Sequence, residues 1–395
     1  MERQNDHLRI GVIGVGNIGF VHASCIFRGA IANAVLAAVC DLKEDIHQEV
    51  NDHFPNVPFY TDYEQMLHDA NIDAVIVAVP HPSHSDIASA AFRAGKHVLI
   101  EKPMDITLSK GKALCEAAKN SGKVFGIMFN QRTGKLFAKA REIVRSGQLG
   151  QLNRTIWIIT NWYRTQHYYD SGTWRATWAG EGGGVLVNQA PHQLDLWQWI
   201  CGKPEQITAF CAEGKHHRIE VEDDVTIFAR FPGGAEGIFT TSTGEYPGTN
   251  RLEISGSKGK LILENGKLKW WRLQEDTRDF CIHSDASFAH IPMEYEEFEE
   301  ESNQYGHQKI LQNFTNAILY GEPLLAPGYD GINELELQNA AYLSAWKGNV
   351  PVSLPIDEEE FNQRLIQKQL GSKITSAVSK DAKHTEYSAR WQINW

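Results

Sequence analysis

The sequence lacks the features that mark secreted, membrane-spanning or thiolate-metal proteins. It has only six cysteines in 395 residues, and no two of them form a C-x-x-C pair, which favours a reduced cytoplasmic protein with buried thiols. No stretch approaches the ~18 consecutive apolar residues that a membrane span needs. No apolar segment precedes the first predicted strand, so we expect no secretory signal.

An excess of basic charge is also missing. The 38 Lys and Arg residues are outnumbered by 49 Asp and Glu residues, which gives a net charge of −11. This balance argues against a nucleic-acid or anionic-membrane partner, because either would need a basic face. Metal-ligand spacing is absent too, and we expect the adjacent pair His216 and His217, in a polar stretch, to lie at the surface. The length and the 42% of hydrophobic residues predict two or three globular domains.

A glycine-rich turn follows the first apolar run. Gly14, Gly16 and Gly19 have the spacing G-x-G-x-x-G between a predicted strand and a predicted helix. This order suits a dinucleotide pyrophosphate, because the glycines allow a tight turn and a close backbone approach, and the helix N-terminus offers N–H donors. We therefore expect Gly14, Gly16, Asn17 and Ile18 to bind a dinucleotide cofactor.

A candidate ribose ligand ends the second apolar run. Asp41 lies 22 residues after Gly19, close to the offset of about 20 residues at which an acid binds the adenosine ribose. A carboxylate there accepts hydrogen bonds from both ribose hydroxyls and repels a 2′-phosphate. The sequence therefore favours NAD over NADP as the cofactor, although Lys43 nearby could soften that choice.

Strands and helices alternate through the first ~125 residues. Predicted strands cover 9–14, 35–40, 74–79, 97–100 and 124–128, and predicted helices cover 16–27, 42–53, 63–69, 84–94 and 110–120. Short apolar strands between amphipathic helices predict a parallel sheet covered on both faces, with the ligand at the carboxyl ends of its strands. The further candidate cofactor residues near those ends are Pro80, His81, His84, Glu101, Lys102 and Asn130.

Strands dominate the second part of the chain. After a predicted helix at 137–146, predicted strands cover 152–163, 206–212, 224–231, 235–242, 251–255, 259–264 and 268–273, and predicted helices cover 187–200, 307–320 and 332–347. Period-2 alternation and Gly-rich turns favour an antiparallel sheet. The predicted domains are a dinucleotide-binding domain at 1–128, a substrate-binding and oligomerisation domain at 129–356, and a C-terminal extension at 357–395. That extension has an acidic helical start and ends either as a mobile tail or as a docked segment on a neighbouring subunit.

The sequence around Glu101-Lys102-Pro103 resembles the Gfo/Idh/MocA oxidoreductases. The resemblance continues through Asn130 to Arg132, Trp174-Arg175, and the run from Gly182 to Asp195, and it covers the chain to about Pro355. It implies an α/β protein with an N-terminal Rossmann domain and a C-terminal α/β domain that has a large, mainly antiparallel open sheet. It also implies a substrate between the domains and a homodimer or homotetramer formed through that sheet. A cis bond before Pro103 is common in similar proteins.

The resemblance also implies a catalytic set. Lys102 matches the family's lysine, and His192 matches its histidine, which takes the proton of an alcohol as hydride leaves. Many relatives carry Asp where this chain has Asn188. We expect Asn188 and His192 to share one helix face, with Asn188 bonding a substrate hydroxyl without charge and His192 working with Lys102. Asp195 is interpreted as a structural residue of the same helix.

The expected sugar pocket contains Arg132, Tyr163, Trp174 and Arg175, together with Asn188 and His192. Guanidinium and amide groups suit hydroxyl edges, and aromatic rings suit C–H faces. For each tryptophan near these segments, core packing is the alternative interpretation, and the candidates are Trp157, Trp162, Trp174, Trp178, Trp197 and Trp199.

The predicted function is NAD(H)-dependent hydride transfer to or from a secondary alcohol of a sugar, glycoside or cyclitol. One alternative keeps the fold but holds NAD permanently and cleaves a glycosidic bond through transient oxidation. A second alternative is a non-catalytic dinucleotide-sensing regulator, which the presence of both Lys102 and His192 disfavours.

Overall fold

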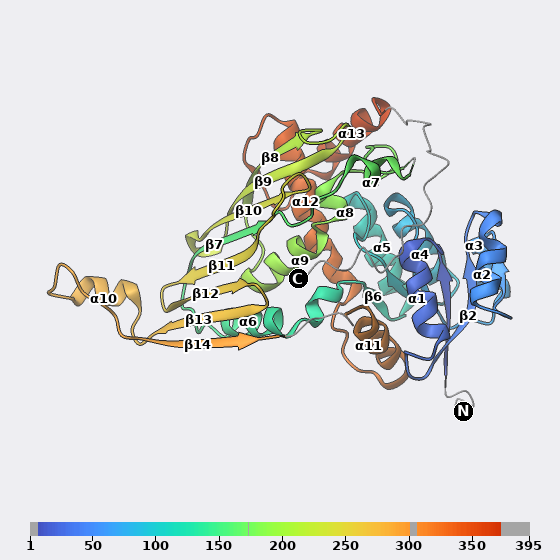
Figure 1. Cartoon of the computed structure of the whole chain (residues 1–395), viewed down its shortest axis with the longest axis horizontal. Helices are drawn as coiled ribbons and strands as arrows, with labels where there is room; N and C mark the ends of the chain where they lie inside the picture. The colour runs from blue at the N-terminus through green and yellow to red at the C-terminus, as the bar shows by residue number, and fades with distance from the viewer. Residues whose placement is uncertain (1–6, 173, 301–305, 373–395) are drawn as a thin grey trace. The chain divides into compact units, whose positions relative to one another are not determined.

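The computed structural model describes residues 7–172, 174–300 and 306–372. The chain forms two compact units, and Figure 1 labels their helices and strands. The first unit contains the described residues up to 133 and those from 306 to 335, and the second unit contains the described remainder. The segment from 306 to 335 thus returns to the first unit after the chain has built most of the second. Each predicted domain is a single continuous range of residues, whereas each unit of the structure is made of two ranges.

The first unit is built on a six-stranded parallel sheet. Its strand order is β3-β2-β1-β4-β5-β6, and every neighbouring pair is parallel. The strands are β1 Leu8–Ile13, β2 Ala34–Cys40, β3 Phe59–Tyr60, β4 Ala74–Val77, β5 His97–Ile100 and β6 Phe125–Ile127. All residues of β4 are buried, as expected for a strand covered on both faces. The predicted Rossmann-type sheet is confirmed, and only the two-residue β3 was not predicted.

Helices accompany this sheet at nearly the predicted positions. They are α1 Asn17–Phe27, α2 His47–His53, α3 Tyr63–Asp69, α4 His84–Arg93, α5 Leu108–Ser121 and, from the returning segment, α11 Gly306–Tyr320. Beyond α11, the backbone N–H of Ile127 donates to the carbonyl of Ala326, and Gly126 forms an antiparallel bridge with Pro327. The returning segment therefore pairs with the β6 edge of the sheet.

The second unit is built on a nine-stranded sheet. Its order is β14-β13-β12-β11-β7-β10-β9-β8-β15, and all pairs are antiparallel except β7 with β10. The strands are β7 Leu152–Ile159, β8 Gln206–Glu213, β9 Glu222–Arg230, β10 Glu236–Ser242, β11 Asn250–Gly256, β12 Gly259–Glu264, β13 Lys267–Leu273, β14 Met293–Glu299 and β15 Val352–Ser353. The mainly antiparallel sheet is confirmed, with β14 and β15 as edge strands that were not predicted.

Helices cover one face of this sheet. The aromatic cluster beneath them includes Trp197 of α9 (Pro191–Cys201), whose indole N–H donates to Thr155 of β7, and Phe137 of α6 (Lys135–Arg145) against Trp157. α12 (Gly331–Trp346) contributes Ser344, whose hydroxyl accepts a hydrogen bond from the backbone of β8. The shorter helices are α7 Gln166–Asp170, α8 Val185–Asn188 and α10 Thr277–His283. Apolar residues on the inward face of the sheet thus form the core of the second unit.

The predicted helix at 187–200 is wrong in one important respect. The structure ends α8 at Asn188 and begins α9 at Pro191, with Ala190 as the N-cap. Proline has no N–H and its ring clashes with the preceding turn, so Pro191 begins a helix and cannot continue one. Asn188 and His192 therefore do not share the face of one helix.

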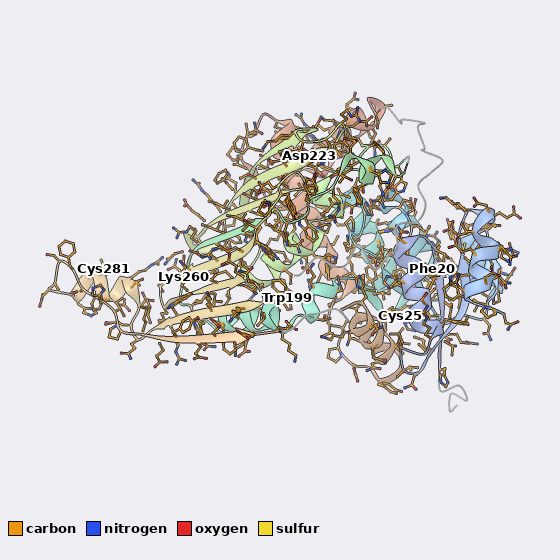
Figure 2. All side chains as sticks on the ribbon, viewed as in Figure 1. Phe20, Cys25, Trp199, Asp223, Lys260 and Cys281 are labelled. Atoms are coloured by element: carbon orange, nitrogen blue, oxygen red, sulfur yellow. The ribbon has the colours of Figure 1, made fainter. Side chains whose placement is uncertain are left out.

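The C-terminal extension begins as predicted. The carboxylate of Asp357 accepts a hydrogen bond from the backbone N–H of Glu360 and caps the acidic helix α13 Glu358–Leu370. Residues 373–395, to which the question of a mobile or docked tail refers, lie outside the described residues. The six cysteines are free thiols, but Cys281 on α10 is exposed (Figure 2), which corrects the expectation that the thiols are buried. In the described part of the chain, we find no helix long and apolar enough to cross a membrane.

Candidate active site

The glycine turn joins β1 to α1 by very close backbone contacts. Gly14 has a positive φ of +86°, and a Cβ atom on it would lie 2.6 Å from the carbonyl oxygen of Ala78. A Cβ atom on Gly19 would overlap the carbonyl oxygen of Gly14. By contrast, no atom lies within 4 Å of the Cβ position of Gly16. Two glycines therefore allow tight packing, and the third faces open space.

This open space fits a dinucleotide pyrophosphate. Gly16 caps α1 without a side-chain hydrogen bond, so the first N–H groups of the helix have no side-chain cap. At the end of β2, Asp41 accepts hydrogen bonds from the backbone N–H groups of Val15 (2.9 Å) and Lys43 (3.0 Å). These bonds hold the carboxylate beside the glycine turn, where the sequence predicted the ribose ligand. The residues that would hold NAD are Gly14, Gly16, Asn17, Ile18 and Asp41.

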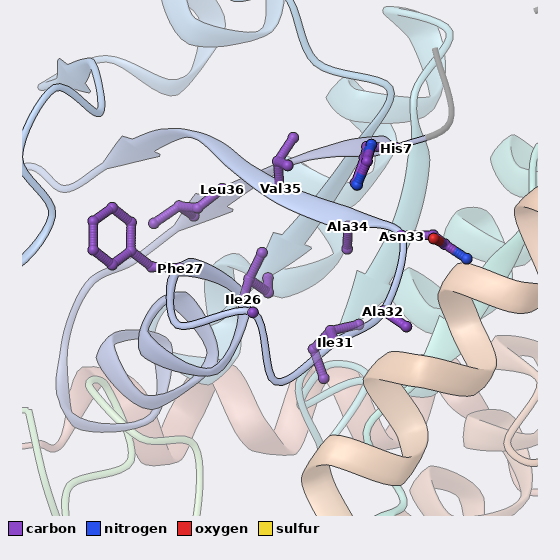
Figure 3. Close-up of a pocket in the computed structure, with 10 residues that line it drawn as sticks. His7, Ile26, Phe27, Ile31, Ala32, Asn33, Ala34, Val35 and Leu36 are labelled. Atoms are coloured by element: carbon purple, nitrogen blue, oxygen red, sulfur yellow. The ribbon is translucent and has the colours of Figure 1, made fainter.

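A separate hollow in the first unit lies at the other end of these strands. It is lined by the end of α1 and by the residues that begin β2, among them Phe27, Asn33 and Ala34 (Figure 3). Ligands of parallel sheets bind at the carboxyl ends of the strands. This hollow is therefore distinct from the predicted cofactor site.

The loop that carries Lys102 is fixed from two sides. Lys102 and Pro103 are joined by a cis peptide bond, directly after β5. The buried ring of His84 contacts two backbone carbonyls at 2.7 Å, Pro103 through Nδ1 and Val79 through Nε2. Burial lowers the pKa of His84, so the neutral ring donates to one of these two carbonyls and packs between the loop after β4 and the lysine loop. Pro80 and His81 lie in the same region, at the start of a short 3₁₀ turn.

A buried carboxylate lies next to Lys102. Glu101 contacts Nε2 of His22 at 2.7 Å, and its other oxygen accepts a hydrogen bond from the backbone N–H of Lys102 at 3.1 Å. Burial alone would raise the pKa of Glu101, but the hydrogen bond and charge of His22, with His307 and Lys102, lower it to about 2. Burial and the neighbouring His22 lower the pKa of His307 to about 4. Glu101 is therefore ionised and holds the lysine loop through its backbone.

The predicted cofactor residue Asn130 and the predicted pocket residue Arg132 have partners within the first unit. The side-chain amide of Asn130 lies 3.4 Å from Nδ1 of His307. The guanidinium of Arg132 is 2% exposed and donates to Asp330 at 2.5 Å, with the ring of Phe129 beneath it. Arg132 thus stabilises the returning segment, and its role in substrate binding stays a prediction.

In the second unit, Glu222 holds the segment that leads to Asn188. Its fully buried carboxylate accepts hydrogen bonds from the backbone N–H groups of Gly184 and Leu186, each at 3.0 Å, and from the Tyr342 hydroxyl at 2.8 Å. Burial raises the pKa of Glu222 to about 8 against the effect of these donors. The start of the four-residue α8 is therefore fixed by a side chain from β9.

Asn188 lies in a cluster of polar side chains. Its side-chain amide donates to Glu181, and its oxygen lies 3.4 Å from the Tyr168 hydroxyl. Arg175 donates to the same hydroxyl at 2.9 Å and stacks over the rings of Tyr168 and Trp174. The structure thus brings together three predicted site residues, Asn188, Arg175 and Trp174, and adds Glu181 and Tyr168 to them.

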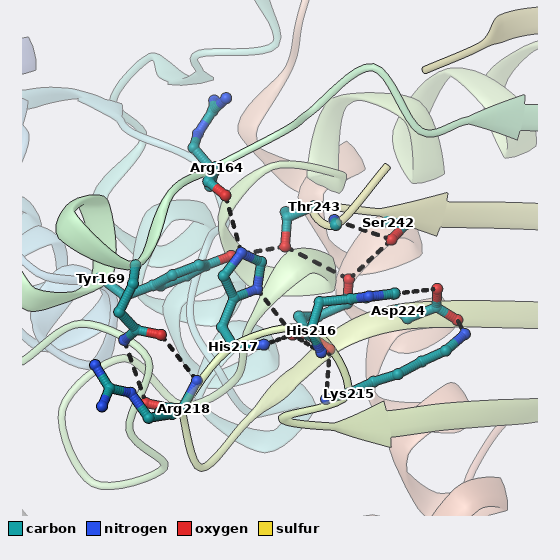
Figure 4. Close-up of polar contacts among 12 residues, drawn as sticks. Arg164, Tyr169, Lys215, His216, His217, Arg218, Asp224, Ser242 and Thr243 are labelled. Carbon is teal, nitrogen blue, oxygen red and sulfur yellow. Dashed lines mark hydrogen bonds and ion pairs between the residues drawn. The ribbon is translucent and has the colours of Figure 1, made fainter. Parts of the chain in front are cut away.

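The loop after β8 anchors α7, which carries Tyr168. The buried carboxylate of Asp223 accepts hydrogen bonds from the backbone of residues 215–217, and His217 bridges Asp223 and the carbonyl of Arg164, each at 2.9 Å (Figure 4). Tyr169 adds a 2.7 Å hydrogen bond to Thr243. The expectation that both histidines lie at the surface is wrong for His217, because Asp223 draws its ring into the unit.

His192, Asp195, Tyr163 and the candidate tryptophans also lie in the second unit. His192 is the second residue of α9 and is 8% exposed. Asp195 is fully buried and accepts a hydrogen bond from Gln198. Tyr163 is half-exposed and contacts the ring of Tyr246. Buried tryptophans form core, and these are Trp157, Trp162, Trp178 and Trp197, whereas Trp174 and Trp199 are partly exposed.

Sequence reasoning missed His22, His307, Glu181, Tyr168 and Glu222. His22 carried a usable signal, because it follows Gly19 on the helix that packs against the sheet. Glu181 directly precedes the three glycines at 182–184 and gave a weaker signal of the same kind. His307, Tyr168 and Glu222 come from distant segments, and no sequence pattern around them indicated a role in the site.

The fold and these loops define an NAD-binding oxidoreductase with a Rossmann domain. Residues 8–129 match the oxidoreductase family with an NAD-binding Rossmann fold, and residues 137–262 match the Gfo/Idh/MocA C-terminal domain. The chain belongs to the Gfo/Idh/MocA family.

The chain aligns with individual relatives over nearly their whole length. The chain is 28% identical to the myo-inositol 2-dehydrogenase of Thermotoga maritima over 85% of this chain and 95% of that one. It is 24% identical to the scyllo-inositol 2-dehydrogenase (NAD(+)) of Bacillus subtilis over 90% and 98%. Among solved structures, the WlbA dehydrogenase of Bordetella pertussis, in complex with NADH and UDP-GlcNAcA, is similar with a TM-score of 0.74 and 27% identity, over 89% of this chain and 100% of that one.

Two glycine variants should separate packing from cofactor binding. Gly19→Ala should lower the free energy of unfolding by roughly 1–3 kcal/mol, because its Cβ has no room against Gly14. Gly16→Ala should leave stability nearly unchanged and weaken NAD binding, because its Cβ enters the open space. Urea unfolding and calorimetric NAD titration measure the two effects. Unchanged NAD affinity in folded Gly16→Ala would contradict the assigned cradle.

His22→Leu should destabilise the first unit. Removal of His22 leaves the buried Glu101 carboxylate without the partner that lowers its pKa most, which costs about 3 kcal/mol of unfolding free energy. The low pKa of Glu101 contributes stability that is present above about pH 4.5 and lost as the pH falls towards 2, so the loss in the variant should shrink in acid. Denaturant unfolding across pH measures this. His68→Leu, which breaks the exposed pair with Asp69, is the control and should change little.

Proposed function

We propose that this protein transfers hydride between NAD and a secondary alcohol of a sugar, glycoside or cyclitol. The observation that carries the proposal is the fixed lysine loop, in which ionised Glu101 and buried His84 hold Lys102 directly after β5. Such rigid placement suits a group that must meet a reacting oxygen. The relatives named for inositol oxidation support the alcohol class.

Lys102 and His192 handle the proton of the alcohol. The Lys102 ammonium donates a hydrogen bond to the substrate oxygen and stabilises negative charge on it, and the His192 imidazole accepts the hydroxyl proton. NAD, when bound, supplies the hydride acceptor. Asp41 bonds the adenosine ribose and excludes a 2′-phosphate, so NADP is the poorer cofactor.

Sugar recognition belongs to Tyr163, Trp174, Arg175 and Asn188, with Arg132 as a further candidate. Aromatic faces contact C–H groups, and the guanidinium and amide groups bond hydroxyls. Trp174 and Arg175 lie against each other, with the guanidinium carbon 4.7 Å from the ring centroid. This pairing offers one apolar and one polar surface on neighbouring residues.

Turnover tests the assigned roles. NADH formation should appear with NAD and at least one member of a panel of cyclitols, pyranoses, sugar acids and glycosides, and Lys102→Ala and His192→Ala should each reduce kcat at least 100-fold. Lys119→Ala, at an exposed position of α5, is the control. Full turnover by either active-site variant would overturn its role. Sugar release without NADH would favour the glycoside-cleaving alternative, and no turnover on the whole panel would favour the regulator.

We further propose that the chain forms a homodimer or homotetramer through the outer face of its large sheet. Phe210 of β8 and Phe228 of β9 are each about half exposed there, with ring centroids 6.3 Å apart. Neighbouring exposed aromatic rings are typical of an interface. Phe228→Glu should shift the sedimenting species towards monomer. Leu42→Glu, at an exposed position of the first unit, should leave the assembly intact, and an assembly unaffected by Phe228→Glu would contradict this interface.

A further inference from the structure

We infer that Glu181 acts through Asn188 as a positioning residue for the substrate. This inference rests on the proposed function, because it concerns how Asn188 is presented to a substrate hydroxyl. The two side chains are in hydrogen-bond contact, so a change at Glu181 reaches the substrate through the amide of Asn188.

Hydrogen-bond chemistry fixes the orientation of the Asn188 amide. The Asn188 atom that contacts Glu181 is the NH₂ group, which donates to a carboxyl oxygen of Glu181. The Asn188 oxygen must then face Tyr168, as the 3.4 Å contact shows. Glu181 therefore holds the Asn188 NH₂ group on its own side and leaves the Asn188 oxygen facing Tyr168.

Tyr168 supports the same orientation from the other side. Its hydroxyl accepts hydrogen bonds from Arg175 at 2.9 Å and from the side chain of Gln189 at 3.2 Å. A phenol has two acceptor lone pairs and one proton. With both lone pairs facing donors, the proton is directed to the Asn188 oxygen.

Glu181 is itself held in place. It is 2% exposed, and its second oxygen accepts a hydrogen bond from the backbone N–H of Ala176 at 2.7 Å. Ala176 has a positive φ of +54°, a conformation that is rare outside glycine and that persists only where surrounding contacts hold it. The carboxylate thus fixes both the loop after Arg175 and the Asn188 amide.

An aspartate in place of Asn188 would conflict with this arrangement. Asn188→Asp puts two carboxylates in hydrogen-bond contact, and they can remain there only by sharing a proton. The double variant Glu181→Gln/Asn188→Asp allows the contact between the two side chains and the contacts with Ala176 and Tyr168 to form again. In it, the oxygen of the introduced glutamine accepts from Ala176, and the NH₂ group of that glutamine donates to the introduced aspartate. The aspartate in turn accepts from Tyr168. The double variant thus keeps the number of carboxyl groups and moves one from position 181 to position 188.

The experiment compares Asn188→Asp, Glu181→Gln and the double variant in the full chain. Asn188→Asp should lower kcat/KM roughly 10- to 100-fold at pH 8, with recovery as the pH falls and one carboxyl takes up a proton. The double variant should recover most of the loss and should show a pH profile of kcat/KM shifted from that of the wild type. Glu181→Gln alone should fall below the double variant. A purely structural role would leave the pH profiles of the folded variants superimposable.

Thermal unfolding gives a readout that is independent of catalysis. Asn188→Asp should lose Tm as the pH rises from 5 to 8, because a shared proton is lost, and the double variant should not. NAD affinity should stay constant in all variants, since the cofactor residues lie in the first unit. Wild-type-like activity and Tm of Asn188→Asp at every pH, or no rescue in the double variant, would overturn the inference. A wild type without dehydrogenase activity would instead defeat the proposed function, and the Tm series would still judge the pairing.

Discussion

Carboxylates that accept hydrogen bonds from backbone N–H groups fix the functional loops of this protein. Glu101 holds the lysine loop, and Asp41 holds the end of β2 beside the glycine turn. Glu222 and Asp223 do the same for the start of α8 and for the loop after β8. Glu181 completes the set at Ala176. A carboxylate accepts several such bonds at once, so a single side chain can set the course of a whole loop.

These carboxylates differ in charge state as well as in position. The pKa of Glu101 is lowered to about 2 by its histidine partner, whereas burial raises the pKa of Glu222 to about 8. The first is compensated by a neighbouring basic side chain, and the second has only neutral donors around it. In the first unit, ionised Glu101 therefore places a negative charge beside Lys102. In the second unit, the start of α8 is held by Glu222, which takes up a proton more readily.

The candidate site was predictable where it depends on local pattern. The glycine spacing, the acid at the end of β2 and the lysine after β5 follow from the order of strands, because parallel strands bring their carboxyl ends to one edge. Pro191 also carried a local signal, and neglect of it produced the wrong shared face for Asn188 and His192. The burial of His217 depended on Asp223, which no periodicity near His217 reveals.

By itself, the sequence determined the alternation of strands and helices, the dinucleotide turn and the change to an antiparallel sheet. Periodicity and turn chemistry are properties of neighbouring residues, so they can be read along the chain. The tertiary structure decided which buried polar groups meet. His22 and Glu101 are 79 residues apart, and Glu222 is 38 residues from the glycine that it holds. Such pairs form only when distant elements pack, because a buried polar group is costly unless it finds a hydrogen-bond partner.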